Sequence, residues 1–387
     1  MRLLHTSDWH LGRNLHREDL LPAQRAFLDH LVDTVRAERV DAVLVAGDVY
    51  DRAIPSLGAV ELFDGVLQRL AELRVPVVLI AGNHDSARRL GIAARLIERA
   101  GVHLRTEVAR CAEPVLLADG HGTVAVYGVP YLEPALARGE LGAGAVSHAA
   151  VLGAAMDRVR ADLAAREPGT RSVVLAHAFV VGGEVSDSER DITVGGVPSV
   201  PAAVFEGIDY TALGHLHGSQ VLGERLRYSG SPLAYSFSEA DHRKSMWLVE
   251  LGPERELTTH RVDCPVPRRL ARLRGTLEGL LTDAALTRHE DAWVQATITD
   301  AQRPERAMEQ LRTRFPHALQ LAFEPVGATG DGFPSYAART RGLGDAEIAL
   351  GFVRHVRGSD PDQAERELLR EAVESVGAGS RGEAGES

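Results

Sequence analysis

Short apolar runs alternate with longer amphipathic stretches over the first hundred residues of the chain. The runs at 1–7, 40–46 and 75–80 have the length and aliphatic character of buried strands. Between them, hydrophobic residues recur at helical spacing over about 20–37 and 57–73. This alternation predicts an α/β core whose functional side chains lie on the loops that follow the strands.

The pattern changes beyond residue 100. Short strands replace helices over about 101–131, a helix is predicted over about 146–166, and 172–176 has the character of another buried strand. The segment 181–200 has no periodicity and is predicted to be a long loop. Further strands are predicted at 209–213, 225–229, 244–251 and 257–263. The later strands predict a second sheet that completes a β-sandwich.

The best domain boundary is the proline pair Pro265 and Pro267. It separates a first domain, 1–264, from a small α+β domain, 265–326, in which we expect helices near 269–282 and 304–315 and strands at 292–298 and 319–324. The glycine-rich stretch 327–341 is predicted to be a linker. Two short helices in 342–376 carry apolar faces that they cannot bury alone, and 377–387 is predicted to be disordered.

Charge and composition exclude several classes of protein. The net charge of −11 at pH 7 argues against unaided binding to a polyanion such as DNA. Lys244 is the only lysine and does not follow a glycine, so the chain has no Walker A loop. Cys111 and Cys264 are too few for a disulfide framework or a zinc–thiolate site. No apolar run is long enough to span a membrane, and the carboxylate of Asp8 comes too early for the apolar core of a signal peptide. We therefore expect a cytoplasmic protein without membrane association.

Five predicted strands end in side chains that can bind metal ions. Each fragment alone is more often a solvated loop, but five at the ends of successive strands indicate one site. The residues are Asp8, His10, Asp48, Asn83, His84, His177, His215 and His217. Histidine, carboxylate and amide ligands without thiolate suit manganese, iron or zinc better than calcium or magnesium. Two such cations about 3.5 to 4 Å apart can activate water and neutralise a phosphoryl group, which favours phosphodiester hydrolysis.

In their order and spacing these motifs resemble the calcineurin-like metallophosphoesterases over about residues 1–260. The motifs are Asp8-x-His10, Gly47-Asp48-x-x-Asp51-Arg52, Gly82-Asn83-His84-Asp85, His177 and Gly214-His215-x-His217. The resemblance implies an α/β/β/α fold, a β-sandwich flanked by helices, with a small α+β cap and a C-terminal helical segment that binds a partner.

The resemblance also implies a role for each residue at the site. One metal ion would be held by Asp8, His10, Asp48 and His217, and the other by Asp48, Asn83, His177 and His215. Both are divalent cations, for which we expect Mn²⁺, and Asp48 would bridge them. His84 would act on the scissile phosphate without binding metal. Asp51 and Asp85 would support the loops from behind the ligands.

Three further motifs resemble the bacterial DNA nucleases of this family. They are the run from His5 to Gly12, Arg190-Asp191-Ile192, and the run from Tyr228 to Leu233. They imply a 3′–5′ exonuclease on double-stranded DNA and an endonuclease on single-stranded and hairpin DNA, acting in DNA repair, recombination and replication. They also imply assembly with SbcC, an ATPase with long coiled coils, in a heterotetramer with two copies of each subunit, whose nuclease domains form a homodimer. The missing Walker A loop agrees with an ATPase on another chain.

Basic residues near the motifs are candidates for DNA phosphate contacts. Those near the predicted metals are Arg13, His16, Arg17 and Arg52. In the small domain, a basic face on its first predicted helix would consist of Arg268, Arg269, Arg272 and Arg274. Since all of the lysine and arginine residues except Lys244 are arginines, a solvated or salt-bridged role fits these positions equally well.

Two other functions fit part of the pattern. A phosphodiesterase or phosphatase that acts on a small nucleotide would use the same metal site, but it would not need residues 265–387. A scaffold with a decayed site would have lost some of the metal-binding residues, and all of them are present. We therefore expect a DNA nuclease.

Overall fold

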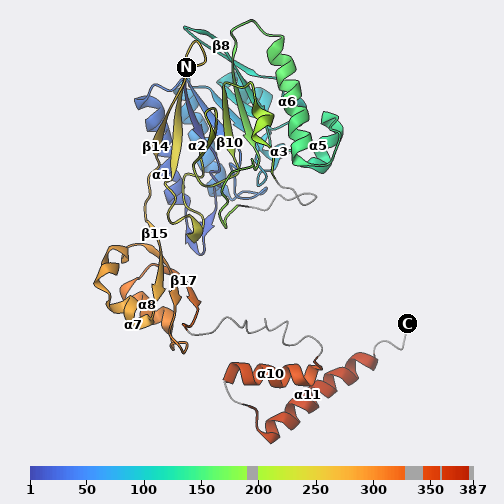
Figure 1. The fold of residues 1–387 in the computed structure, drawn as a ribbon, viewed down its shortest axis with the longest axis vertical. Coiled ribbons are helices and arrows are strands. Elements are labelled where there is room, and N and C mark those ends of the chain that lie inside the picture. Colours follow the sequence, from blue (N-terminus) through green and yellow to red (C-terminus); the bar gives the residue numbers. More distant parts are fainter. Residues whose placement is uncertain (190–198, 327–342, 358–359, 383–387) are drawn as a thin grey trace. The chain divides into compact units, whose positions relative to one another are not determined.

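The structure is a computed structural model (Figure 1) that describes residues 1–189, 199–326, 343–357 and 360–382. The chain forms two compact units, Met1–Glu324 and Pro325–Ser387.

Two six-stranded sheets form the body of the first unit. The first sheet has the order β14-β13-β1-β4-β5-β6. Strands β1, β4, β5 and β6 are parallel to one another. Strand β13 is antiparallel to β1, and β14 is antiparallel to β13. The bounds are β1 (Arg2–Thr6), β4 (Ala42–Ala46), β5 (Val77–Ile80), β6 (Val102–Arg105), β13 (Ser245–Leu251) and β14 (Leu257–Asp263).

The second sheet has the order β11-β12-β10-β9-β8-β7. Strands β8, β9, β10 and β12 are parallel, and the edge strands β7 and β11 are antiparallel to their neighbours. The bounds are β7 (Val115–Asp119), β8 (Gly122–Val129), β9 (Arg171–His177), β10 (Tyr210–Gly214), β11 (Gln220–Gly223) and β12 (Leu226–Tyr228). Strand β11 was not predicted from the sequence.

Alternating side chains in each strand face two different cores. Leu3, Leu44 and Ile80 point into the core between the sheets, whereas Leu4 and Leu79 pack on the opposite face. Helices α1 (Leu21–Ala37) and α2 (Leu57–Glu72) cover that opposite face of the first sheet, and α5 (Pro134–Leu141) and α6 (His148–Ala164) cover the second sheet (Figure 1). The predicted α/β/β/α fold is therefore confirmed. Smaller elements are β2 (Asn14–Leu15), β3 (Glu18–Asp19), α3 (Ala87–Leu90) and α4 (Ala94–Ile97).

The cap is a three-stranded parallel sheet with its own core. It contains β15 (Leu270–Gly275), α7 (Leu277–Thr282), β16 (Trp293–Ile298), α8 (Ala307–Arg314) and β17 (Ala318–Phe323). The expected helix near 269–282 was wrong over its first half, which is β15. Ala271 and Leu273 are buried while Arg272 and Arg274 are exposed, and this period of two is that of a strand. Pairing with β16 stabilises the extended form, and the helix begins only after its N-cap Thr276.

The cap packs on the first domain through Leu270, Trp293 and Leu319. These side chains contact an apolar cluster that includes Leu15 and Tyr235. The cap is therefore joined to the body near the loops that follow β1.

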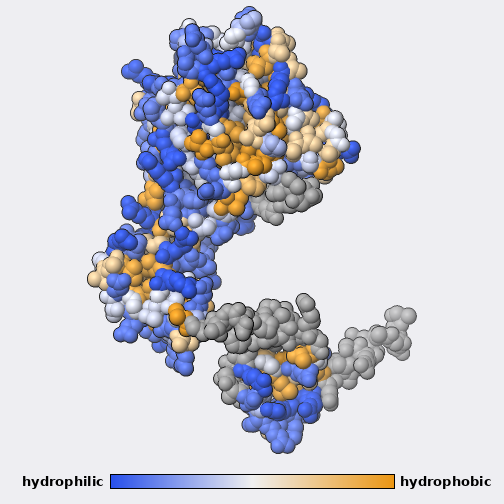
Figure 2. All heavy atoms as spheres, viewed as in Figure 1, coloured by the Kyte–Doolittle hydropathy of each residue, from blue (hydrophilic) through white to orange (hydrophobic). Residues whose placement is uncertain are grey.

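The described part of the second unit contains α10 (Asp345–Arg357) and α11 (Gln363–Gly382), close to the two predicted helices. Helix α11 continues to Gly382, beyond the start of the predicted disordered tail, and residues 383–387 lie outside the described residues. The predicted linker 327–341 also lies outside them. Apolar residues gather in the middle of the helix pair in Figure 2. Within the described ranges, no helix has both the length and the apolar character needed to cross a bilayer.

Candidate metal centre

The ends of five strands from the two sheets meet at one place. Asp8 follows β1, Asp48 follows β4 and Asn83 follows β5, while His177 ends β9 and His215 follows β10. Parallel strands bring their carboxyl ends to the same edge of a sheet, so the two stacked sheets present these residues to one another. Three groups of buried side chains have potential ligand atoms within 4.8 Å of one another. The groups are Asp8, His10 and His217; His10, Asp48 and His84; and Asp8, Asp48 and His177.

Asp48 lies between two sets of donors. Its Oδ2 atom is 3.7 Å from Nε2 of His10 and 3.4 Å from Nε2 of His177. On the side of His177, the Asn83 Oδ1 atom lies 2.9 Å from His177 Nε2 and 3.3 Å from His215 Nδ1. This is the position required of a carboxylate shared by two cations.

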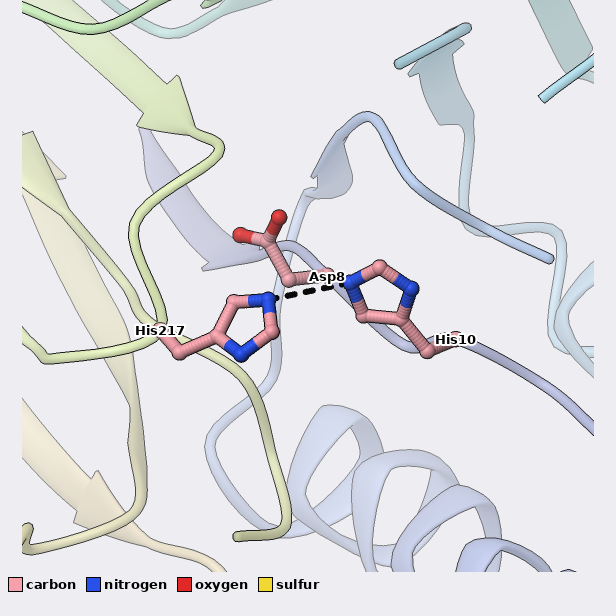
Figure 3. A group of neighbouring side chains, drawn as sticks. All are labelled: Asp8, His10 and His217. Carbon is pink, nitrogen blue, oxygen red and sulfur yellow. Dashed lines mark hydrogen bonds between the residues drawn. The ribbon is translucent and has the colours of Figure 1, made fainter. Parts of the chain in front are cut away.

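On the other side of Asp48, two imidazoles point at each other. The Nε2 atoms of His10 and His217 are 3.0 Å apart, and Asp8 lies beside them (Figure 3). Asp8 and His10 come from the loop after β1, and His217 comes from the loop after β10. The Asp8 carboxylate also accepts hydrogen bonds from the backbone N–H of His215, at 3.0 and 3.2 Å. That contact ties the two loops together.

The donors fit a pair of divalent metal ions. His177 donates its Nδ1–H to the carbonyl of Ala46 at 2.9 Å, so in the neutral ring that a metal ion requires, the lone pair is on Nε2, which lies on the side of Asp48. The Nε2 atoms of His10 and His217 are buried and within hydrogen-bond distance of each other, and a cation can take the place of the proton between them. The residues present therefore suit metal binding in their chemistry and in their tautomers.

Burial and mutual charge shift the pKa values of the cluster. Burial raises the pKa of Asp8 to about 6 and lowers the pKa of His215 to about 3. Burial acts to lower the pKa of His177, but the Asp48 carboxylate overcomes it and raises that pKa to about 9. Metal ligands must be ionised carboxylates and neutral imidazoles, so cations would release the protons that this cluster otherwise holds.

His84 borders the cluster on its more exposed side. It is 9% exposed, whereas the neighbouring His10 is fully buried. Its backbone N–H donates to Asp48 at 2.8 Å, and its Nδ1 lies 2.8 Å from the carbonyl oxygen of Asp51. Proximity to His10 and Asp48 alone does not separate His84 from a metal ligand. The Asp51 carbonyl therefore fixes which side of the ring carries Nδ1 and which carries Nε2.

The two carboxylates expected behind the ligands have different surroundings. Asp85 accepts hydrogen bonds from the backbone N–H groups of Val49, Tyr50 and Gly82, at 3.1, 2.9 and 3.0 Å. It therefore ties the loop after β4 to the loop after β5. Asp51 lies 3.8 Å from Nδ1 of His10 and pairs with Arg13 at 3.6 Å and Arg52 at 3.5 Å.

The backbone at the site adopts conformations that side chains rarely allow. Asp8, His10, Asp48 and His215 have φ values of 52°, 44°, 50° and 108°. At Gly214, a Cβ atom would lie 1.9 Å from the carbonyl oxygen of Ala46. The ends of β10 and β4 thus approach so closely that only glycine fits there. Strain of this kind persists where the surrounding structure enforces it, which is common at functional sites.

The candidate DNA-contacting residues differ in their availability. Arg13 donates to the carbonyl of Ser188 and lies over the Tyr235 ring, whereas the Arg52 side chain is 83% exposed. His16 and Arg17 are exposed.

The basic residues of the cap lie on and before a strand instead of on a helix. Arg268, Arg272 and Arg274 each pair with a carboxylate, and Arg269 is exposed. The pairing weakens the expectation of a basic face.

The sequence did not predict the groups behind His217. Ser188, Glu189, Glu239 and Lys244 contact its ring or its main chain. The unusual presence of a single lysine was the one sequence signal that could have directed attention to them. The motif Arg190-Asp191-Ile192 lies outside the described residues.

Two family models match the chain. The model described as calcineurin-like phosphoesterase matches residues 1–219, which is more than half of the 387 residues. The chain therefore belongs to the calcineurin-like phosphoesterase family, and it is a metal-dependent phosphoesterase. The second model, SbcD_C, described as type 5 capsule protein repressor C-terminal domain, matches residues 266–335.

Among solved structures, the chain is similar to that of a novel archaeal phosphodiesterase. The sequence identity is 12%, the match covers 68% of this chain and 100% of that chain, and the TM-score is 0.29. So low a TM-score adds nothing to the family assignment.

Proposed function

We propose that the chain is the nuclease subunit SbcD of a complex with the ATPase SbcC, and that it cleaves DNA with two metal ions. The observation that carries the proposal is Asp48, placed between two sets of metal-binding side chains. The order of the two family models along the chain, a phosphoesterase followed by an SbcD_C domain, supports the choice of a DNA nuclease within the family.

The proposed ligands follow the two sides of Asp48. One metal ion is held by Asp8, His10, Asp48 and His217, and the other by Asp48, Asn83, His177 and His215. Mn²⁺ suits this mixed set of nitrogen and oxygen donors. When bound, the ions supply an activated water and neutralise charge on the phosphoryl oxygens.

His84 acts on the substrate in this proposal. The carbonyl of Asp51 accepts the Nδ1–H of the ring whether the imidazole is neutral or protonated. The protonated ring then presents Nε2–H to the phosphate, where it stabilises charge or protonates the leaving oxygen. Arg13, His16, Arg17 and Arg52 are the proposed contacts of the site to the DNA backbone, and Arg268, Arg269, Arg272 and Arg274 those of the cap.

The helix pair of the second unit is the proposed docking element for SbcC. Among its described side chains, none of the hydrophobic residues on α10 and α11 is buried, and Phe352 and Leu368 are 55% and 66% exposed. Helices with such faces need another apolar surface, and a coiled coil offers one.

A second apolar surface supports the proposed homodimer of nuclease subunits. Ile54, Leu57, Ile92 and Leu96 are 72%, 74%, 70% and 66% exposed. Ile92 lines a groove of about 660 Å³ beside α2 that includes Phe63, and Ile54 and Leu96 are next in sequence to other residues that line it. Large apolar side chains left this exposed mark a protein interface. A dimer through this face would give the heterotetramer two nuclease subunits and two SbcC chains, which we place in the cytoplasm.

The deciding experiment is a cleavage assay in Mn²⁺ with the purified chain, alone and with SbcC. Linear duplex DNA labelled at either end and a DNA hairpin are the substrates, and a small phosphodiester is assayed in parallel. We expect shortening of the duplex from its 3′ ends and opening of the hairpin. Turnover of the small phosphodiester without cleavage of either DNA would favour the small-nucleotide phosphodiesterase instead.

A further inference from the structure

The only lysine of the chain is buried beside the candidate metal centre. Lys244 is 5% exposed, and its ammonium group pairs with the carboxylate of Glu239, which is 1% exposed. The same ammonium donates to the backbone carbonyl of His217 and to the hydroxyl of Ser231, both at 2.9 Å. The ion pair thus reaches the main chain of a proposed metal ligand.

The other end of the ion pair reaches the ring of the same ligand. Ser188 donates its hydroxyl hydrogen to Glu239 Oε1, and its oxygen lies 2.6 Å from Nδ1 of His217. Glu239 Oε1 is itself 3.5 Å from that nitrogen. Because the hydroxyl has one hydrogen, which Glu239 takes, the Ser188 oxygen must accept the Nδ1–H of His217. Nε2 of His217 then carries the lone pair, directed at His10.

The location of the ion pair is difficult to explain by stability alone. A buried ion pair loses the hydration of both charges, and apolar residues of similar volume often stabilise a fold as well or better. Here both charged groups make contacts to His217, and Glu189 adds a third by accepting the His217 backbone N–H at 2.7 Å. Carboxylates behind a metal-binding histidine fix its tautomer and orientation.

We propose that the Glu239–Lys244 ion pair, acting through Ser188, positions His217 and sets the affinity of the metal site formed by Asp8, His10 and His217. The second site, formed by Asn83, His177 and His215, is oriented by other contacts, among them the carbonyl of Ala46. Glu239 and Lys244 are therefore positioning residues for one metal ion. This proposal rests on the proposed two-metal function.

The test is a titration of the full chain with Mn²⁺ by calorimetry and by electron paramagnetic resonance, without substrate. We expect two ions to bind the wild type. In Glu239→Gln, which keeps the shape of the side chain but removes its charge, one ion should bind about 10- to 100-fold more weakly and the other unchanged. Ser188→Ala breaks the link to the ring without removing the ion pair, and it should weaken binding of the same ion. This second variant keeps the test decisive if Glu239→Gln does not fold.

Asp119→Asn is the matched control. It breaks another ion pair, between the partly exposed Asp119 and Arg171, which is fully buried and lies at the opposite end of β9 from His177. The control should lower the melting temperature and leave both Mn²⁺ affinities unchanged. Unchanged Mn²⁺ affinities in both Glu239→Gln and Ser188→Ala would overturn this proposal alone. An equal loss of affinity for both ions in these two variants and in the control would also overturn it. A wild-type chain that does not bind two ions would overturn the two-metal function as well.

Discussion

His84 is the residue whose proposed role is most directly testable. It sits beside the donors of both proposed metal ions without being needed by either, since each has other ligands. We predict that His84→Ala lowers the rate of DNA cleavage by about 10²- to 10⁴-fold, the usual contribution of a general acid. The metal content, measured by mass spectrometry of the purified variant, should remain at two ions. Loss of an ion would show instead that His84 is a ligand, as its distance to His10 and Asp48 allows.

His5 should contribute to the dependence of stability on pH. It is fully buried between the sheets, with Nδ1 2.8 Å from the Tyr210 hydroxyl and Nε2 3.1 Å from the carbonyl of Leu213. Burial lowers its pKa to about 3, while an unfolded histidine titrates near 6.5. The unfolded chain therefore binds the extra proton first, and the stabilising effect present above pH 6.5 is lost as the pH falls toward 3.

Between pH 7 and pH 5, His5 alone should reduce the free energy of unfolding by about 2 kcal/mol. Urea unfolding at both pH values measures this loss. The variant His5→Gln, which cannot titrate, should show a pH dependence smaller by that amount. An identical dependence in both proteins would contradict the assignment.

At the scale of single residues, the sequence predicted the candidate metal ligands but not the side chains that hold these ligands in position. Asp48 and Asn83 could be recognised because each stands at the end of an apolar run. Ser188 and Glu239 lie 29 and 22 residues from His217, and only the folded chain shows that they meet its ring. The positive φ values of Asp8 and His215 leave no mark in the sequence either, because tertiary contacts impose them.

Among the elements, the junction of β10 with β4 should tolerate no side chain. Because a Cβ at Gly214 would overlap the carbonyl of Ala46, Gly214→Ala should separate the two strand ends and displace His215. We expect loss of tight Mn²⁺ binding and a lower melting temperature, measured by calorimetry and thermal unfolding.

Gly153→Ala is the control for this substitution. Gly153 lies in α6, and a Cβ there would meet nothing within 4 Å. Alanine should leave Mn²⁺ binding unchanged and stabilise the helix by up to about 1 kcal/mol. Equal effects of the two substitutions would show that the close approach of the strands has no role in metal binding.

The cap shows where the prediction of elements from sequence failed. Both its later strands were predicted, but β15 was assigned to a helix. Leucine, alanine and arginine are good helix formers, and local preference therefore favoured the wrong element. Pairing with β16 and burial of Ala271 and Leu273 decided the outcome, and neither is visible in the isolated segment.

At the scale of the whole molecule, the division into two units allows the proposed partner site to be removed separately. Deleting residues 341–387 removes α10 and α11 and affects only the second unit. We predict that the truncated chain no longer binds SbcC in size-exclusion chromatography and still contains two Mn²⁺ ions. Retained binding to SbcC would exclude the helix pair as the docking element.

Removal of the metal ions should also lower the stability of the folded chain. The first sheet supplies Asp8, His10, Asp48 and Asn83, while the second supplies His177, His215 and His217. A ligand that binds only the folded state at 100 times its dissociation constant stabilises that state by about 2.7 kcal/mol. We therefore expect a chelator to lower the melting temperature and re-added Mn²⁺ to restore it. An unchanged melting temperature would contradict metal binding across the two sheets.

Because its proposed ligands come from both sheets, the metal centre would hold the two sheets together where their strands end. A cell short of manganese would then lose this enzyme in two ways, since the remaining molecules would be inactive and would also unfold and be degraded sooner. The supply of one metal would thus control both the activity of the protein and its abundance.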